Sequence, residues 1–108
     1  NMWKEKLALY DALIDQLPDV ERKGKTMPYT SANGHMFSQL NKAGEIGIRL
    51  PKMEREKFMV DHQTTLFTAY NTVMKEYVLI PDTLLNDLST LANYLEMGHQ
   101  YVKSLKPK

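Results

Sequence analysis

The dipeptide Asn33-Gly34 constrains the fold of this chain more than any other feature, because both residues tolerate the positive φ angles of a tight hairpin turn. It predicts two antiparallel strands, near residues 25–31 and 35–41. Pro28 falls within the first of these strands and cannot donate a backbone hydrogen bond. We therefore expect the first strand to be an edge strand or to contain a bulge.

Two further strands follow from the apolar pattern. After a turn over residues 41–44, the segment 45–50 alternates apolar with small or polar residues, which is typical of a half-buried strand. Residues 72–80 form the longest strand-like run, with apolar residues on both faces, and we expect it inside the sheet. The segment 62–71 fits either a brief strand or an ordered loop.

Helical patterns flank the strands. An apolar stripe with spacings of three and four residues predicts a helix over residues 2–17, and Pro51 begins a short helix over 52–61 whose buried side includes Phe58. Asp87 is a suitable N-cap for a final helix, in which Gly98 would let another backbone approach closely. The predicted architecture is α+β, an antiparallel sheet (a meander plus one long later strand) with the N- and C-terminal helices on one face.

Composition agrees with one globular domain. The chain has 108 residues, of which 43% are hydrophobic and none is cysteine, so disulfides and thiolate metal sites are excluded. No apolar run approaches the length of a membrane span. We treat residues 1–108 as a single domain and expect only the Lys-Pro-Lys end to be disordered.

Turn glycines, core aliphatic residues and a tyrosine strand occur in an order that resembles the N-terminal domain of TfoX/Sxy-type competence regulators. The residues that carry this likeness are Lys25-Thr26-Met27, Gly34-His35-Met36-Phe37, Gly44, Ile46, Ile48, Leu50, Phe67, Met74-Lys75-Glu76-Tyr77-Val78-Leu79-Ile80-Pro81, Asp87, Leu91 and Tyr94.

The resemblance spans about residues 3–105 and implies an α+β fold, a bacterial cytoplasmic setting and a loose link to regulation of transcription. It implies no catalytic residues. The chain departs from the family after Met27, where it has Pro28-Tyr29-Thr30-Ser31 in place of an aromatic residue and paired glycines. A role of that glycine segment is therefore not carried over.

The search for catalytic and metal-binding patterns favours a protein that is not an enzyme. The three histidines, His35, His62 and His99, lack the spacing of zinc ligands, and no phosphate-binding or nucleophile motif is present. We therefore assign no catalytic, cofactor or metal residues. The less favoured alternative is a hydrolase-type or metal-dependent enzyme in which His35, His62 and an acid converge.

Charge is unevenly distributed along the chain. Eight positive and four negative residues in 21–57 sum to +4, and three lysines in 101–108 add +3, against a total of +1. This favours, as an alternative function, sequence-independent nucleic-acid binding. The candidate contact residues for nucleic acid or another partner are Arg22, Lys23, Lys25, Tyr29, Lys42 and Arg49.

Aromatic residues in or beside the sheet have two readings. Tyr29, Tyr70, Tyr77 and Phe37 would either pack under the helices, which we favour, or form a stacking platform for single strands. Our leading hypothesis is a small cytoplasmic interaction or regulatory module. It would bind a protein partner or a second copy of itself through the edge of the first strand or the sheet face left uncovered by the helices.

Overall fold

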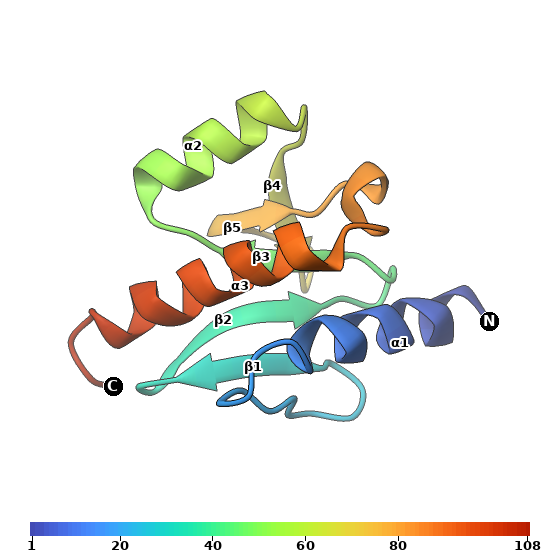
Figure 1. The fold of residues 1–108 in the computed structure, drawn as a ribbon, viewed down its shortest axis with the longest axis horizontal. Coiled ribbons are helices and arrows are strands. Elements are labelled where there is room, and N and C mark those ends of the chain that lie inside the picture. The colour runs from blue at the N-terminus through green and yellow to red at the C-terminus, as the bar shows by residue number, and fades with distance from the viewer.

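The computed structural model describes residues 1–108 and shows an α+β fold (Figure 1). Its elements are α1 (Met2–Ile14), β1 (Tyr29–Ala32), β2 (His35–Leu40), β3 (Ile46–Arg49), α2 (Lys52–Asp61), β4 (Leu66–Ala69), β5 (Thr72–Leu79), the 3-10 turn η1 (Asp82–Leu84) and α3 (Leu88–Lys103).

The five strands form one antiparallel sheet in the order β1-β2-β3-β5-β4. The first three strands are the predicted meander, and β5 lies inside the sheet as its apolar pattern predicted. The uncertain segment 62–71 contains strand β4. It forms a second hairpin with β5 through Tyr70 and Asn71, whose φ angles are 55° and 57°. Two successive positive φ angles match the twist of a tight hairpin.

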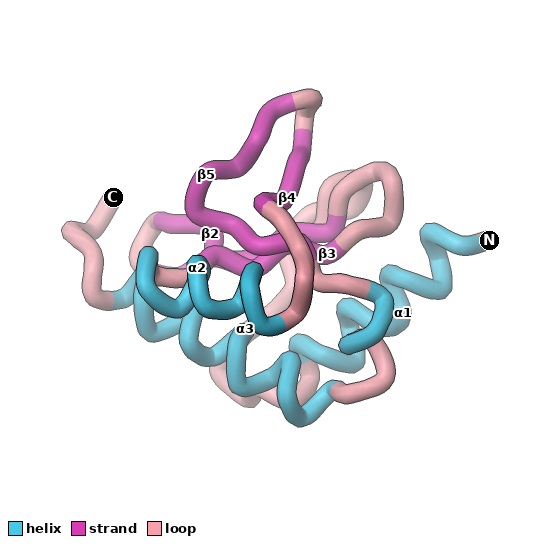
Figure 2. The backbone as a smooth tube through the Cα atoms, turned by 90° about the horizontal axis from the view of Figure 1, so that it is seen from above, coloured by secondary structure: helices cyan, strands magenta, loops and turns pink.

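The helices lie on one side of the sheet, as predicted, and the β4–β5 hairpin extends from the other side (Figure 2). No helix has the length and apolar character needed to cross a membrane. The main core lies between α1, α3 and the sheet, and α2 adds the aromatic ring of Phe58. Its fully buried members include Tyr10, Leu13, Phe37, Leu40, Ile48, Phe58, Val78, Leu91 and Leu95.

Helix boundaries agree with the prediction except at two positions. Helix α1 ends at Ile14 rather than Leu17, although Leu17 is still buried. Pro51 is the N-cap of α2 with extended backbone and precedes its first helical residue. Phe58 is buried on this helix as predicted, with Met59 packed against the same core, whereas Met53 is 78% exposed.

Strand β2 contains a bulge that places two consecutive residues on the same face of the sheet. Thr30 pairs with Ser38 and Ser31 pairs with Met36, so Phe37 has no partner on β1. Phe37 stacks on His99 of α3, with ring centroids 5.1 Å apart. Ser38 bonds the Tyr10 hydroxyl of α1 at 2.6 Å. Both residues therefore face the helices, because the bulge interrupts the alternation of side chains between the two faces of the sheet.

The free edge of β1 is shorter than the sequence predicted. The strand begins at Tyr29, after the buried Pro28, instead of at residue 25. Lys23 pairs with Tyr29 through two backbone hydrogen bonds of 2.8 and 2.9 Å. This bridge occupies the outward groups of Tyr29 and leaves little of the exposed edge that we expected for self-association.

Residues 104–108 are docked on the β1–β2 turn rather than disordered. The Asn33 side-chain amide donates to the carbonyl groups of Val102 and Leu105, both at 2.9 Å. The backbone N–H of Lys108 donates to the Asn33 carbonyl at 3.2 Å. Figure 1 shows the C-terminus beside this turn.

Candidate functional site

The largest cavity of the protein lies between the β4–β5 hairpin and the turn that joins β2 to β3. Its volume is about 340 Å³. The hairpin contributes residues 68–71 and the turn contributes residues 41–43 and 45, with Met27 completing the wall. Three segments that are distant in the sequence therefore converge on one cavity, which mixes apolar, amide and charged groups.

Two side-chain amides of β2 and the turn after it hold the hairpin in place. Gln39 Nε2 donates to the Tyr70 hydroxyl at 3.0 Å. Asn41 Nδ2 donates to the Thr68 carbonyl at 2.8 Å and also contacts Glu45. These bonds tie the tip of the hairpin to the second strand of the meander, across the face of the sheet that carries no helix.

A small second core lies under the hairpin. Phe67, Ala69 and Tyr77 are buried there, with Met36, Met74 and Leu79 packed around them. The helix-free face that we expected to be open for a partner is therefore covered in part by the hairpin. What remains exposed is its tip, where Tyr70 is 65% and Val73 is 52% exposed.

The Gln39 side chain has an unpaired acceptor. The residue is fully buried, and its Oε1 atom has no hydrogen-bond partner. A buried acceptor without a partner typically costs about 1–3 kcal/mol. Gln39 Nε2 bonds the Tyr70 hydroxyl, and Tyr70 lines the cavity, so the unsatisfied amide lies one side chain behind the cavity wall.

Two of the six predicted contact residues are engaged in ion pairs within the protein. Arg22 binds Asp11 of α1 through Nε, at 2.6 Å, and through Nη2, at 3.4 Å. Arg49 binds Glu76 through Nε, at 2.8 Å, and through Nη2, at 2.7 Å. Both arginines join elements of the fold, and their charges are compensated by acidic side chains within the protein.

The other four predicted residues are distributed along β1 and β2. Lys23 lies beside β1, where its Nζ donates to Ser31 Oγ at 3.2 Å. Lys25 is exposed in the bend before Tyr29, which is itself only half-exposed on β1. Lys42 lines the cavity at the far end of β2. Because Tyr29 is half-exposed and Tyr77 is buried, these two tyrosines do not form an open stacking platform. Phe37 packs under the helices.

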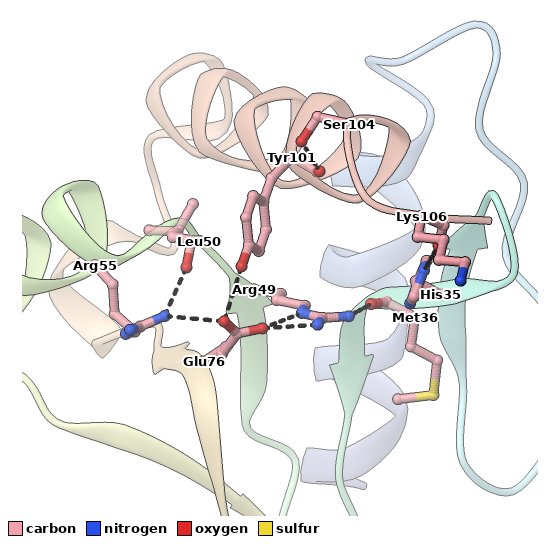
Figure 3. Close-up of polar contacts among 9 residues, drawn as sticks. All are labelled: His35, Met36, Arg49, Leu50, Arg55, Glu76, Tyr101, Ser104 and Lys106. Atoms are coloured by element: carbon pink, nitrogen blue, oxygen red, sulfur yellow. Dashed lines mark hydrogen bonds and ion pairs between the residues drawn. The ribbon is translucent and has the colours of Figure 1, made fainter. Parts of the chain in front are cut away.

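Glu76 joins four elements of the fold (Figure 3). Its carboxylate accepts hydrogen bonds from Arg49 and from the Tyr101 hydroxyl, at 2.8 Å each, and lies 3.9 Å from Arg55 Nη1. Burial alone would raise the pKa of Glu76. The Tyr101 and Arg49 hydrogen bonds and the two guanidinium charges outweigh burial and hold this pKa below its ordinary value. None of the three cavities is lined by Glu76, Arg49, Arg55 or Tyr101.

The three histidines have separate surroundings. His35 Nε2 donates to the Lys106 carbonyl at 2.8 Å, and His62 packs against Phe58 and Tyr94. His99 bonds Glu96 at 3.1 Å beside a second cavity, of about 280 Å³. No group of three or more metal-ligating side chains comes together. The histidine-centred site with His35 and His62, considered from the sequence, is not formed.

Gln39, Asn41 and Thr68 were not predicted from the sequence as parts of a site. Amide and hydroxyl residues give no motif signal, and these three come together only because the β4–β5 hairpin turns back over the sheet. The single usable sign was the Tyr70-Asn71 pair, since Asn tolerates the positive φ of a hairpin turn.

Comparisons with known proteins found no relative. No protein-family profile, no curated protein and no solved structure gives a significant match to the chain.

Proposed function

We propose that this protein is a small, non-enzymatic interaction module that binds a segment of a protein partner at the cavity between the β4–β5 hairpin and the β2–β3 turn. The observation that carries the proposal is the exposed tip of the hairpin beside that cavity, with Tyr70 and Val73 open to solvent. Tyrosine is among the residues that dominate binding energy at protein interfaces. Met27 in the cavity wall adds an adaptable apolar contact.

The resemblance to the TfoX N-terminal domain supports a regulatory role in a bacterial cytoplasm. That resemblance rests on the order helix, hairpin, strand, short helix, long strand and final helix, and the chain has these elements in this order with strand β4 added before the long strand β5. In this proposal the chain acts like a stand-alone version of such a domain, and the partner supplies the biochemical effect.

A displayed library of random peptides, selected on the purified protein, tests the proposal without knowledge of the partner. We expect selected peptides to shift the amide NMR signals of residues 41–45 and 68–73. The variant Tyr70→Asn with Val73→Thr keeps residues suited to the turn and the strand. It should bind these peptides about tenfold or more weakly, since each interface anchor contributes over about 1 kcal/mol.

The matched control changes two of the other exposed apolar side chains. Met53 and Val60 lie on α2 and are 78% and 77% exposed. Met53→Ala with Val60→Ala should leave peptide affinity within about twofold, because surface changes away from an interface have small effects. Equal affinity of the hairpin variant, or signal shifts confined to α2, would overturn the proposal. Sedimentation of the peptide-free protein as a dimer would instead assign the surface to self-association.

A further inference from the structure

We propose that the β1–β2 turn and the docked C-terminal segment form a binding surface for the phosphate backbone of a nucleic acid. We name this surface the tail patch and define it as Lys23, Lys103, Lys106 and Lys108. The tail patch lies at the opposite end of β2 from the cavity proposed above to bind a peptide segment. The two proposals can therefore be tested independently.

Hydrogen bonds bring the C-terminal lysines to the turn. Asn33 donates to two carbonyl groups at the end of α3, and Lys108 donates back to Asn33. His35 Nε2 donates to the Lys106 carbonyl at 2.8 Å, as Figure 3 shows. Because a carbonyl oxygen only accepts, this nitrogen carries the proton. The segment that holds Lys106 and Lys108 is thus fixed on the hairpin.

Lys23 also lies on this hairpin, although it precedes β1 in the sequence and the other three lysines lie near the C-terminus. Its backbone pairs with Tyr29, and its Nζ donates to Ser31 Oγ at 3.2 Å. Ser31 is two residues from Asn33, to which Lys108 is bonded. The basic middle segment and the basic tail, separate in the sequence, therefore meet at one turn.

The charges of the tail patch are not neutralised within the protein. None of its four lysines forms an ion pair, whereas Lys6, Arg22, Arg49, Arg55 and Lys57 all do. Four exposed and unpaired ammonium groups make a local positive surface on a chain whose total charge is only +1.

The surroundings of the patch favour phosphate over an acidic peptide. The exposed large apolar residues of the protein, Met2, Met53, Val60, Tyr70 and Val73, all lie on other elements. A peptide interface requires buried apolar anchors, but a phosphate backbone is held by cations and hydrogen-bond donors alone. Binding of this kind reads no sequence and weakens with salt.

Fluorescence anisotropy with labelled duplex and single-stranded DNA of about 20 nucleotides, at about 50 and about 200 mM salt, tests the proposal. Each lysine–phosphate contact contributes about 0.9 to the salt slope on duplex DNA. Lys23→Glu with Lys106→Glu should therefore lower the slope by about 2 and weaken binding at low salt at least tenfold. No binding by the unaltered protein at low salt would overturn the proposal.

The control is Lys4→Glu with Lys52→Glu, which makes the same change in net charge on α1 and α2. Both lysines are exposed and form no ion pair, and a glutamate in the first turn of a helix is favourable. This control should keep binding within about threefold, because only a general charge effect remains. Equal losses in the two double variants would show attraction by net charge and would overturn the tail patch.

A third variant tests whether docking of the tail assembles the patch. Asn33→Gly keeps the positive φ of 58° but removes the two donors to Val102 and Leu105, without changing any charge. We expect a several-fold loss of DNA affinity and an unchanged far-UV circular dichroism spectrum. Full affinity in this variant would contradict assembly by docking. Polyglutamate that competes as well as DNA at equal charge would contradict specificity for phosphate.

Discussion

The ring of Phe67 lies directly against Gly47, so closely that a Cβ atom at residue 47 would be 2.3 Å from the ring. Gly47 is on β3 and Phe67 is on β4, which are not adjacent in the sheet. The hairpin can fold over the helix-free face only because this position of β3 has no side chain. The contact therefore determines both the second core and the cavity.

Gly47→Ala should displace Phe67 and destabilise the protein by about 1–3 kcal/mol, the usual cost of forcing extra volume into a packed site. Urea denaturation would measure the change. If the clash is the cause, the change should be smaller when Phe67→Ala is already present, giving a clear coupling in the double-mutant cycle. Additive effects would mean that the residues act independently.

Gly98→Ala should destabilise the protein although alanine is the better helix former by about 1 kcal/mol. A Cβ atom on Gly98 would lie 2.6 Å from the carbonyl oxygen of Arg49, a backbone atom that cannot turn aside. Thermal unfolding should show a lower Tm than the unaltered protein. Ala92→Gly on the same helix provides the comparison, since it should cost helix propensity and the contacts of one half-buried methyl group, with no backbone clash. A rise in Tm for Gly98→Ala would contradict the close approach of α3.

Ser38→Ala should cost about 1–3 kcal/mol, because it leaves two buried hydroxyl groups without their shared partner. Ser38 Oγ is 2.6 Å from the Tyr10 hydroxyl and is also bonded to Thr30 Oγ1. Thr30→Val removes one end of this chain and leaves the Tyr10–Ser38 bond intact. In denaturant titrations we expect Thr30→Val to lower the free energy of unfolding less than Ser38→Ala does. The reverse order would argue against a row of hydrogen bonds that Ser38 shares with Tyr10 and Thr30.

Acid should weaken the cluster around Glu76. Because the folded pKa of this carboxylate lies below its ordinary value of 4.5, its contribution to stability is complete above that value and is lost as the pH falls through the folded pKa. Glu76→Gln should cost about 1 kcal/mol near pH 7, a modest value because the group is partly exposed. It should also flatten the acid limb of the stability curve. An unchanged acid limb would show that other carboxylates control it.

Alkali should destabilise the protein through Tyr77. Burial raises the pKa of this phenol to about 12, against an ordinary value of 10.0. Between these values the unfolded chain releases the proton and the native protein keeps it. As the pH rises through this range, Tyr77 alone should therefore lower the free energy of unfolding by about 1.4 kcal/mol per pH unit. Tyr77→Phe should reduce this slope in urea titrations, while the buried Tyr10, whose pKa burial also raises, maintains part of it. The same slope in Tyr77→Phe would exclude Tyr77 as its source.

The sequence by itself determined the elements and their class. The Asn33-Gly34 turn, the alternating strand of 46–50 and the apolar stripes of the end helices are local signals, since period and turn chemistry act over a few residues. They predicted the meander, the interior position of β5, the Asp87 cap and the close approach at Gly98, all of which the structure confirms.

Only the tertiary structure decided which side chains meet. The Gln39–Tyr70 and Asn41–Thr68 bonds, the pairing of Arg22 and Arg49 with acids, and the docking of the tail on Asn33 all join residues far apart in sequence. A charge or an amide carries no periodic signal of its partner, and a bulge such as that at Phe37 changes which face a residue occupies. The cavity and the tail patch depend on these long-range contacts, which the packing of the hairpin and of α3 against the sheet produces.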